Sequence, residues 1–265
     1  MGALIGPNVP ALSVCAWALG DTAACLPPLR ALGFESVDLE PVALDDPQLV
    51  PTLERERLSP CCIAADHGLP LGCSLTGDEQ ARVMALAHLA TVLRRWSAIG
   101  GRFAYVTPHA GVATTKELGD TLAQLAEWGS SVGVSVCVEH APGQAVVTAS
   151  GGLELVRAVG HPSLFLLIDI GHCIISGEDP GHAIARTGSL LGYVHLDDND
   201  GVSDLHWKPL DGRLTEAMLK RVADALGDVR AGIALELSPR LPNPTAALRE
   251  ARELMLTLLT QAAKQ

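Results

Sequence analysis

Apolar runs of five or six residues recur along the chain, and stretches with the spacing of amphipathic helices separate them. The runs predict eight buried strands, at 12–17, 36–40, 60–65, 102–107, 134–139, 164–169, 190–195 and 232–236. The helical patterns lie near 22–32, 46–57, 78–98, 115–132, 150–159, 180–187, 214–226 and 243–261. Because short connections between alternating strands and helices force parallel strands with right-handed crossovers, the pattern predicts an α/β protein, a (β/α)8 TIM barrel.

The main structural alternative is a doubly wound open sheet. No Gly-rich dinucleotide loop follows the first predicted strand, which favours the barrel. The chain has 265 residues and shows no linker, repeat or low-complexity segment. Since barrels of about 250 residues form one unit, residues 1–265 are predicted to be a single domain.

Four of the predicted strands end in a side chain that can bind a metal ion: Glu139, Asp169, His195 and Glu236. A single carboxylate or histidine after a buried strand is often structural, but the carboxyl ends of barrel strands converge on one mouth. Glu236 also stands between two leucines, where an unpaired carboxylate would be costly without a cation or hydrogen bonds. The coincidence of four such ends predicts a divalent-metal enzyme site.

Asp169 ends the sixth predicted strand, and His172 follows three residues later, directly after Gly171. An Asp and a His three residues apart around a glycine predict a tight turn that aims both side chains into one site. We therefore expect His172 to lie at the same mouth as the four strand ends.

The donor set indicates which ions fit and what they would do. Three carboxylates and one imidazole favour Mn²⁺, Co²⁺, Mg²⁺ or Zn²⁺ over ions that prefer thiolates. Four protein ligands leave two positions of an octahedral ion for substrate oxygens. Two metal-linked glutamates on opposite sides of a sugar would suit proton transfer next to a carbonyl.

The amino-acid composition indicates which classes of molecule the protein binds. The formal net charge is −11, with 30 acidic and 19 basic residues, which argues against a surface built for a phosphate backbone. We therefore expect a small-molecule substrate and no nucleic acid. Seven cysteines, several within apolar runs, predict free thiols rather than a disulfide framework. No signal peptide or membrane span is recognisable, so the expected location is the cytoplasm without membrane contact. The oligomeric state stays open, a homo-oligomer included.

Four motifs carry a family resemblance: Val-Glu-His (138–140), Ile-Asp-Ile-Gly-His (168–172), Val-His-Leu-Asp-Asp-Asn-Asp-Gly (194–201) and Leu-Glu-Leu (235–237). With them the chain resembles the xylose-isomerase-like TIM-barrel superfamily, which includes sugar phosphate isomerases and epimerases, inosose dehydratases, hydroxypyruvate isomerases and the endonuclease IV enzymes (apurinic endonuclease family 2). The resemblance implies that Glu139 and Glu236 are the acid/base pair and that His172 contacts substrate. It implies four metal ligands: Glu139, Asp169, His195 and Glu236.

One departure from the family pattern concerns substrate binding. Sugar 3-epimerases of this family usually carry an arginine six residues after the ligand histidine, where this chain has Gly201. Arg213, on a later loop, is a candidate replacement. Trp17, at the end of the first predicted strand, is a candidate to stack on a sugar ring, although a place in the barrel core is equally consistent with the sequence.

A second departure points to a different reaction class. Asp204-Leu-His206 resembles the Asp-x-His pair that endonuclease IV enzymes use for an additional zinc, and His67 and His109 follow the third and fourth predicted strands, where those enzymes place further ligands. These residues would permit a multinuclear zinc site that activates water against a phosphodiester. The same pair also occurs in family members that resemble sugar isomerases, where His67 and His109 would bind substrate hydroxyls.

The sequence thus leads to one main hypothesis and three alternatives. The main hypothesis is a metal-dependent isomerase or epimerase of carbohydrate metabolism that binds one divalent ion and a sugar or polyol. The first alternative is an endonuclease-IV-like hydrolase with more than one zinc, which the acidic loops at 66–72 and 197–200 disfavour. The others are a dehydratase or lyase that uses the same site, and a barrel without catalytic activity.

Overall fold

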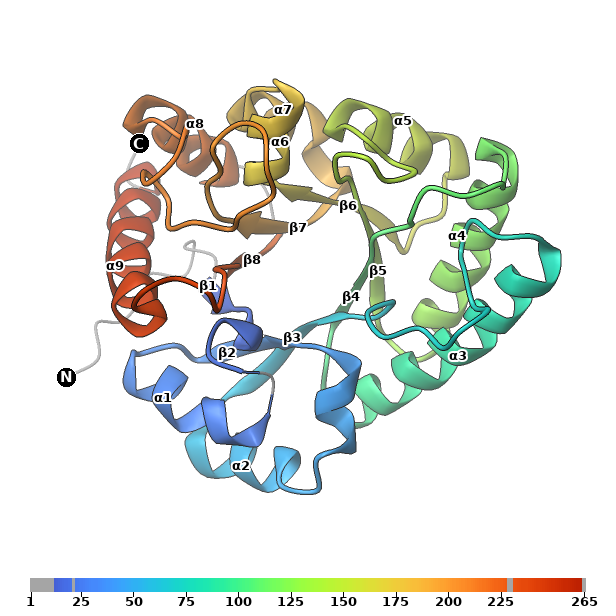
Figure 1. Ribbon diagram of the computed structural model, residues 1–265, viewed down its shortest axis with the longest axis horizontal. Coiled ribbons are helices and arrows are strands. Elements are labelled where there is room, and N and C mark those ends of the chain that lie inside the picture. Colours follow the sequence, from blue (N-terminus) through green and yellow to red (C-terminus); the bar gives the residue numbers. More distant parts are fainter. Residues whose placement is uncertain (1–11, 21, 228–230, 264–265) are drawn as a thin grey trace.

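Eight parallel strands form the centre of the molecule, and helices surround them (Figure 1). The structure is a computed structural model that describes residues 12–20, 22–227 and 231–263. The strands are β1 (Leu12–Val14), β2 (Ser36–Leu39), β3 (Ser59–Ala64), β4 (Phe103–Val106), β5 (Ser135–Glu139), β6 (Leu164–Asp169), β7 (Leu191–Leu196) and β8 (Gly232–Leu235). Each predicted strand is present, so the predicted alternation is confirmed.

The strands close into a barrel. Their order is β1-β8-β7-β6-β5-β4-β3-β2, and β1 pairs with β8 in the register Leu12 to Ile233. A parallel bridge between Cys15 and Asp38 joins the end of β1 to β2 and completes the ring. The (β/α)8 TIM barrel predicted from the sequence is therefore correct, and the open sheet is excluded.

The helices form the outer layer of the barrel in Figure 1. They are α1 (Leu26–Ala31), α2 (Leu49–Glu56), α3 (Glu79–Ala98), α4 (Thr115–Ser131), α5 (Ala149–Val159), α6 (Ile170–Ser176), α7 (Pro180–Thr187), α8 (Glu216–Gly227) and α9 (Pro244–Ala262). Short 3₁₀ segments occur at Ala16–Ala18, Ala23–Cys25, Pro41–Asp45 and Gly188–Leu190. Among the described residues, none of the helices combines the length and apolarity required to cross a membrane.

The first strand and first helix are shorter than predicted. β1 ends at Val14, and Trp17 lies in a 3₁₀ segment instead of a strand. The helix expected at 22–32 divides into a 3₁₀ turn and α1, which has prolines at its first positions. Proline lacks the N–H that an interior helical position must donate, but it fits the first turn. The two prolines at 27 and 28 therefore fix the start of α1.

The hydrophobic core has two parts. One lies between the strands and the helices and holds most of the buried aliphatic side chains. The other fills the barrel and consists of Cys15, Cys62, Ala64, Tyr105, Cys137, Leu167, Tyr193 and Ala234. Small residues make room for the two tyrosines: a Cβ on Gly232 would lie only 2.1 Å from Cε2 of Tyr193. The cysteines are free thiols.

Candidate metal centre

The four strand ends singled out in the sequence meet at the carboxyl end of the barrel. Ligand atoms of these residues all lie within 4.8 Å of one another, and the residues are at most 7% exposed. Strand register produces this meeting, because Asp169 on β6 stands opposite His195 on β7, and Glu236 directly follows β8. The four residues, which we call the quartet, are Glu139, Asp169, His195 and Glu236.

The imidazole of His195 lies between two of the carboxylates. Its Nδ1 atom is 2.5 Å from Oε2 of Glu236 and 3.3 Å from Oε1 of Glu139. Thr107 donates its hydroxyl to the other oxygen of Glu139, at 2.5 Å. Oδ2 of Asp169 and both ring nitrogens of His195 are buried without a hydrogen bond of good geometry.

Charge crowding is the main electrostatic feature of the quartet. Three buried carboxylates repel one another and have lost most of their hydration, which is costly unless a cation compensates. A set of oxygen and imidazole donors with unsatisfied atoms suits a divalent ion such as Mn²⁺, Mg²⁺, Co²⁺ or Zn²⁺. The quartet is therefore consistent with a divalent-metal site.

Without a metal, the repulsion among the three carboxylates is reduced by the positive charge of protonated histidines and by a proton on a carboxyl group. Burial raises the pKa of Glu236, but the positive charges of His195 and His206 outweigh it and lower this pKa to about 2. Burial lowers the pKa of His195, whereas Glu236 and Glu139 raise it well above its usual value. Burial and the nearby Asp197 hold the pKa of Asp169 well above its usual range. At neutral pH His195 is thus protonated between two carboxylates.

Metal affinity should consequently increase with pH. An ion bound at Nδ1 must displace the proton of His195, and because the pKa of this imidazole is raised, protons compete with the ion throughout the neutral range. Because the pKa of Asp169 is raised as well, at least one proton is released, and the apparent affinity for Mn²⁺ should rise at least about tenfold per pH unit between about pH 6 and 8. Calorimetric titration in buffers with different ionisation enthalpies measures both the affinity and the proton release. An affinity that does not change over this range would contradict the prediction.

Asp169 also caps a helix, which the sequence pattern did not predict because it indicated a tight turn at this place. Residues after β6 form the helix α6, and Oδ1 of Asp169 caps it by accepting the backbone N–H of His172 at 2.7 Å. The expected turn is therefore the first turn of a helix. Capping uses one carboxylate oxygen and leaves Oδ2 for the quartet. Gly171 is required here because a Cβ would lie 2.3 Å from Oδ1 of Asp197.

A second group of potential ligands adjoins the quartet. His172, Asp204 and His206 have ligand atoms within 4.8 Å of one another, and so do Asp169, Asp197 and His206. Nε2 of His172 is 3.3 Å from Asp204, and Nε2 of His206 is 3.0 Å from the same carboxylate. The structure thus brings the Asp-x-His pair and His172 to the mouth, as the sequence predicts.

The charges in this group are mutually compensating. Burial lowers the pKa of His172, but Asp169 and Asp204 raise it to about 11. Burial raises the pKa of Asp204, while hydrogen bonds with His172 and His206 bring it well below its usual range. The group can hold either a second cation or its own imidazolium ions.

His67 and His109 lie apart from these groups. Nδ1 of His67 is 3.0 Å from Oε1 of Glu40, and Nδ1 of His109 is 3.0 Å from Oε1 of Gln144. Both histidines line a cavity of about 480 Å³, together with Glu40, Asp66, Cys73 and Ser74. Among the described residues, neither histidine belongs to a group that could hold a metal ion.

One residue links this cavity to the quartet, although no member of the quartet lines it. Thr107 connects the two, because its backbone N–H donates to Oδ2 of Asp66 at 2.9 Å while its hydroxyl donates to Glu139. The ring of Trp17 lies 6.3 Å from the ring of His67, measured between centroids. His67 and Trp17 therefore stand near one another at the mouth.

Arg213 lies at a different place. It lines a separate cavity of about 410 Å³ with Gly201, Glu178 and Asp179, and its Nε donates to the carbonyl of Asp200 at 3.0 Å. Its Cγ is 3.4 Å from the position that a Cβ on Gly201 would occupy. Arg213 thus fills space beside Gly201, but it is not part of the metal-ligand groups.

The loop after β7 is stabilised by two buried residues, Asp198 and Asn199. The sequence predicted no role for either of them. The Asp198 carboxylate accepts the backbone N–H groups of Asn199, Leu210, Gly212, Arg213 and Leu214, at 2.8 to 3.0 Å. Oδ1 of Asn199 accepts those of Leu205 and His206. Short polar side chains after a strand are known to bond nearby backbone, so the run Asp-Asp-Asn-Asp was the available signal.

Comparison with known proteins agrees with this geometry. A family model described as xylose isomerase-like TIM barrel matches residues 27–258. Fructoselysine 3-epimerases of Escherichia coli O157:H7 and Shigella flexneri are each 25% identical over 164 residues. That match spans 58% of this chain and 59% of the relatives, so the chain matches little more than half of their length.

Solved structures share the fold over nearly the whole chain. An L-ribulose 3-epimerase has a TM-score of 0.78 at 19% identity and covers 96% of this chain and 95% of its own. A D-psicose 3-epimerase, solved in the presence of D-fructose, has a TM-score of 0.76 at 14% identity, with coverages of 94% and 99%. The IOLI protein with a bound zinc atom scores 0.76 at 16% identity, with coverages of 95% and 99%.

Proposed function

The chain belongs to the xylose isomerase-like TIM barrel family, and from this membership we propose that it is a divalent-metal-dependent isomerase or epimerase of a small sugar or polyol. The observation that carries the proposal is the quartet, four buried ligand side chains that converge at the carboxyl end of the barrel and are linked through Thr107 to a cavity of about 480 Å³. Distant similarity to fructoselysine 3-epimerases supports a sugar as the substrate.

In this proposal Glu139, Asp169, His195 and Glu236 hold the ion. When bound, the ion would polarise a substrate carbonyl and make the neighbouring C–H bond more acidic. Glu139 at the end of β5 and Glu236 after β8 approach the same His195 nitrogen from different strands. One carboxylate takes the proton from carbon, and the other, after it has taken up a proton from solvent, returns that proton to the opposite face. The charges of His195 and His206 lower the pKa of Glu236 in the metal-free site, so this residue is a carboxylate at neutral pH and can accept a proton.

The neighbouring cavity suits an uncharged polyol. Its volume falls within the roughly 300–1,000 Å³ of small-molecule sites, and Asp66, His67, Ser74 and His109 offer hydrogen-bonding groups to hydroxyls. No lysine or arginine is among the described residues that line it. The lining therefore favours a neutral sugar over a sugar phosphate. His172 and Trp17, at the same mouth, are the proposed additional substrate contacts.

Proton exchange with solvent tests the proposal directly. Protein loaded with Mg²⁺ is incubated in D₂O with L-ribulose, D-psicose, D-fructose, D-tagatose, an inosose and hydroxypyruvate, and NMR follows loss of the C–H signal next to each carbonyl. We expect deuterium incorporation with at least one compound, its loss on chelation and its recovery when metal is restored. Metal-loaded protein that exchanges none of them would contradict the proposal. Loss of water from the substrate would instead identify a dehydratase or lyase.

A second candidate function is an endonuclease-IV-like zinc hydrolase. The observation that favours it is the group of His172, Asp204 and His206 next to the quartet. Elemental analysis of protein purified without chelators separates the two candidates: about one metal per chain supports the isomerase, whereas about three supports the hydrolase. The positions of His67 and His109, bonded to Glu40 and Gln144, favour the lower number.

A further inference from the structure

A buried carboxylate stands inside the barrel, beneath the quartet. Asp38 on β2 is fully buried, and its Oδ1 accepts hydrogen bonds from the hydroxyls of Ser13, at 2.6 Å, and Tyr193, at 2.8 Å. Its other oxygen, Oδ2, is buried without a partner. Two donors on one oxygen fix the carboxylate and leave an acceptor site on the other.

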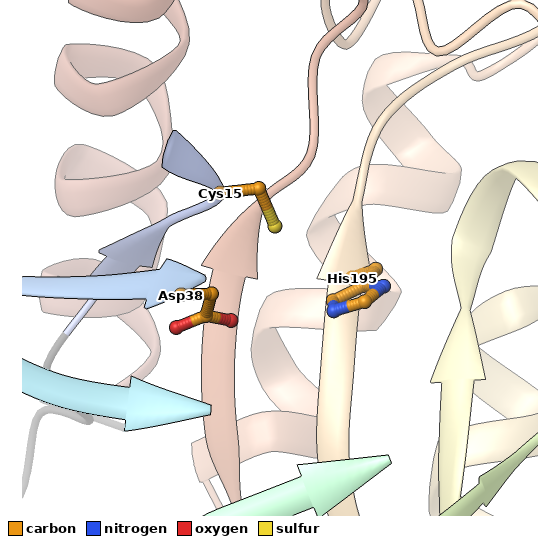
Figure 2. Close-up of side chains that lie close together, drawn as sticks. All are labelled: Cys15, Asp38 and His195. Atoms are coloured by element: carbon orange, nitrogen blue, oxygen red, sulfur yellow. The ribbon is translucent and has the colours of Figure 1, made fainter. Parts of the chain in front are cut away.

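His195 presents a ring nitrogen to the same space. A nitrogen of His195, the Sγ of Cys15 and an Asp38 oxygen lie within 4.8 Å of one another, and none of these residues is exposed. Figure 2 shows the imidazole facing Asp38, with the thiol of Cys15 beside them. Because Nδ1 lies against Glu236 and Glu139, Nε2 is the nitrogen left for this side, and it has no hydrogen-bond partner.

A metal-bound His195 would need a hydrogen-bond acceptor on the side of its ring that faces Asp38. A neutral imidazole that binds a metal through Nδ1 carries its proton on Nε2. A buried N–H needs an acceptor, since leaving it unpaired costs about 1–3 kcal/mol. Two acceptors are near His195: the carboxylate of Asp38 and the thiol of Cys15, and sulfur is the weaker of the two.

A ring nitrogen of His195 and the Asp38 carboxylate are more than 4.0 Å but at most 4.8 Å apart. We propose that Asp38 is a positioning residue that closes this distance when a metal binds, accepts the Nε2–H of His195 and so keeps Nδ1 free for the metal. This inference rests on the metal-ligand role of His195 in the proposed function. Ser13 and Tyr193 would act one step further out, because they orient the carboxylate by binding its other oxygen. A chain of side chains from β1, β2 and β7 would thus set the direction of one metal ligand.

The test compares zinc affinity and the state of the His195 ring. Zn²⁺ is used because it is diamagnetic, and its Kd is measured by competition with a chelating dye. Asparagine in Asp38→Asn keeps the size of the side chain but offers only a neutral oxygen. We expect Kd to rise about 10–100-fold, the usual effect of losing a partner behind a metal ligand. Cys15→Ala, the matched control that removes the other acceptor, should leave Kd unchanged.

NMR of ¹⁵N-histidine-labelled protein reports the state of both His195 ring nitrogens. These signals would not change if Asp38 had only a structural role. In zinc-loaded wild type, His195 should show a metal-bound Nδ1 and a downfield Nε2–H, and this proton resonance should move upfield in Asp38→Asn. Zinc on Nε2 in the wild type would overturn the inference even if Asp38→Asn does not fold. An affinity loss in Cys15→Ala without one in Asp38→Asn would also overturn it. Wild type that binds no zinc would refute the proposed metal site itself.

Discussion

Replacing Glu236 with glutamine is expected to slow substrate proton exchange about 10²–10⁴-fold, the contribution typical of a general acid or base. Glutamine preserves the shape of the side chain and one oxygen for a metal, but its amide cannot take up a proton from carbon. Glu236 is the residue for this test because its carboxylate is buried directly beside Nδ1 of His195, at the proposed metal position. The rate is measured by NMR in D₂O at saturating Mg²⁺, so that weaker metal binding does not dominate the result.

The control for this substitution is the same change at an exposed position. Glu250 on α9 binds Lys208 on the surface, and Glu250→Gln should leave the exchange rate unaltered. Elemental analysis of both variants shows whether the ion is retained. A Glu236→Gln protein with wild-type exchange and wild-type metal content would exclude Glu236 from the chemistry.

Replacing Asp198 with alanine is expected to lower the free energy of unfolding by about 3–5 kcal/mol, among the largest losses a single substitution causes. The carboxylate is fully buried and accepts five backbone N–H groups from its own loop. Alanine would leave these donors without their acceptor. Urea unfolding followed by circular dichroism measures the change.

Asp200→Ala is the matched control, because Asp200 lies in the same loop but its carboxylate is at the surface. Asp200 accepts two backbone N–H groups at the surface, where water can replace the lost acceptor, so its substitution should cost clearly less than that of Asp198. The Asp198 loop also carries Asp204 and His206 to the mouth. Equal losses for the two substitutions would show that the buried hydrogen bonds of Asp198 do not stabilise the loop.

Much of the fold and of the candidate site follows from local patterns in the sequence. A buried parallel strand reads as a continuous apolar run, so the ends at Glu139, Asp169 and His195 are visible without any structure. Their meeting then follows from the geometry of a barrel. The quartet was predictable because each member stands at the end of an apolar run that local hydrophobicity already identifies as a strand.

Other features depend on contacts that no local pattern encodes. Asp38 lies within a strand and reads as an ordinary polar position, and its approach to His195 arises only when β2 and β7 face each other across the barrel. Helix α6 is too short to show a helical period, so Asp169 and His172 read as a turn. His67 and His109 follow their strands as expected, but their partners Glu40 and Gln144 come from other loops.

The pairing of the first strand, β1, with the last strand, β8, affects when the barrel can close during synthesis. A ribosome releases β1 first, yet the parallel partner of Leu12–Val14 is Ile233–Leu235, and Glu236 follows directly. At about 5–20 residues per second, the first strand waits on the order of 10–50 s for that partner. An unpaired strand edge is a site for unwanted association during this interval. The proposed metal site is therefore complete only after Glu236 has been synthesised and β8 has paired with β1.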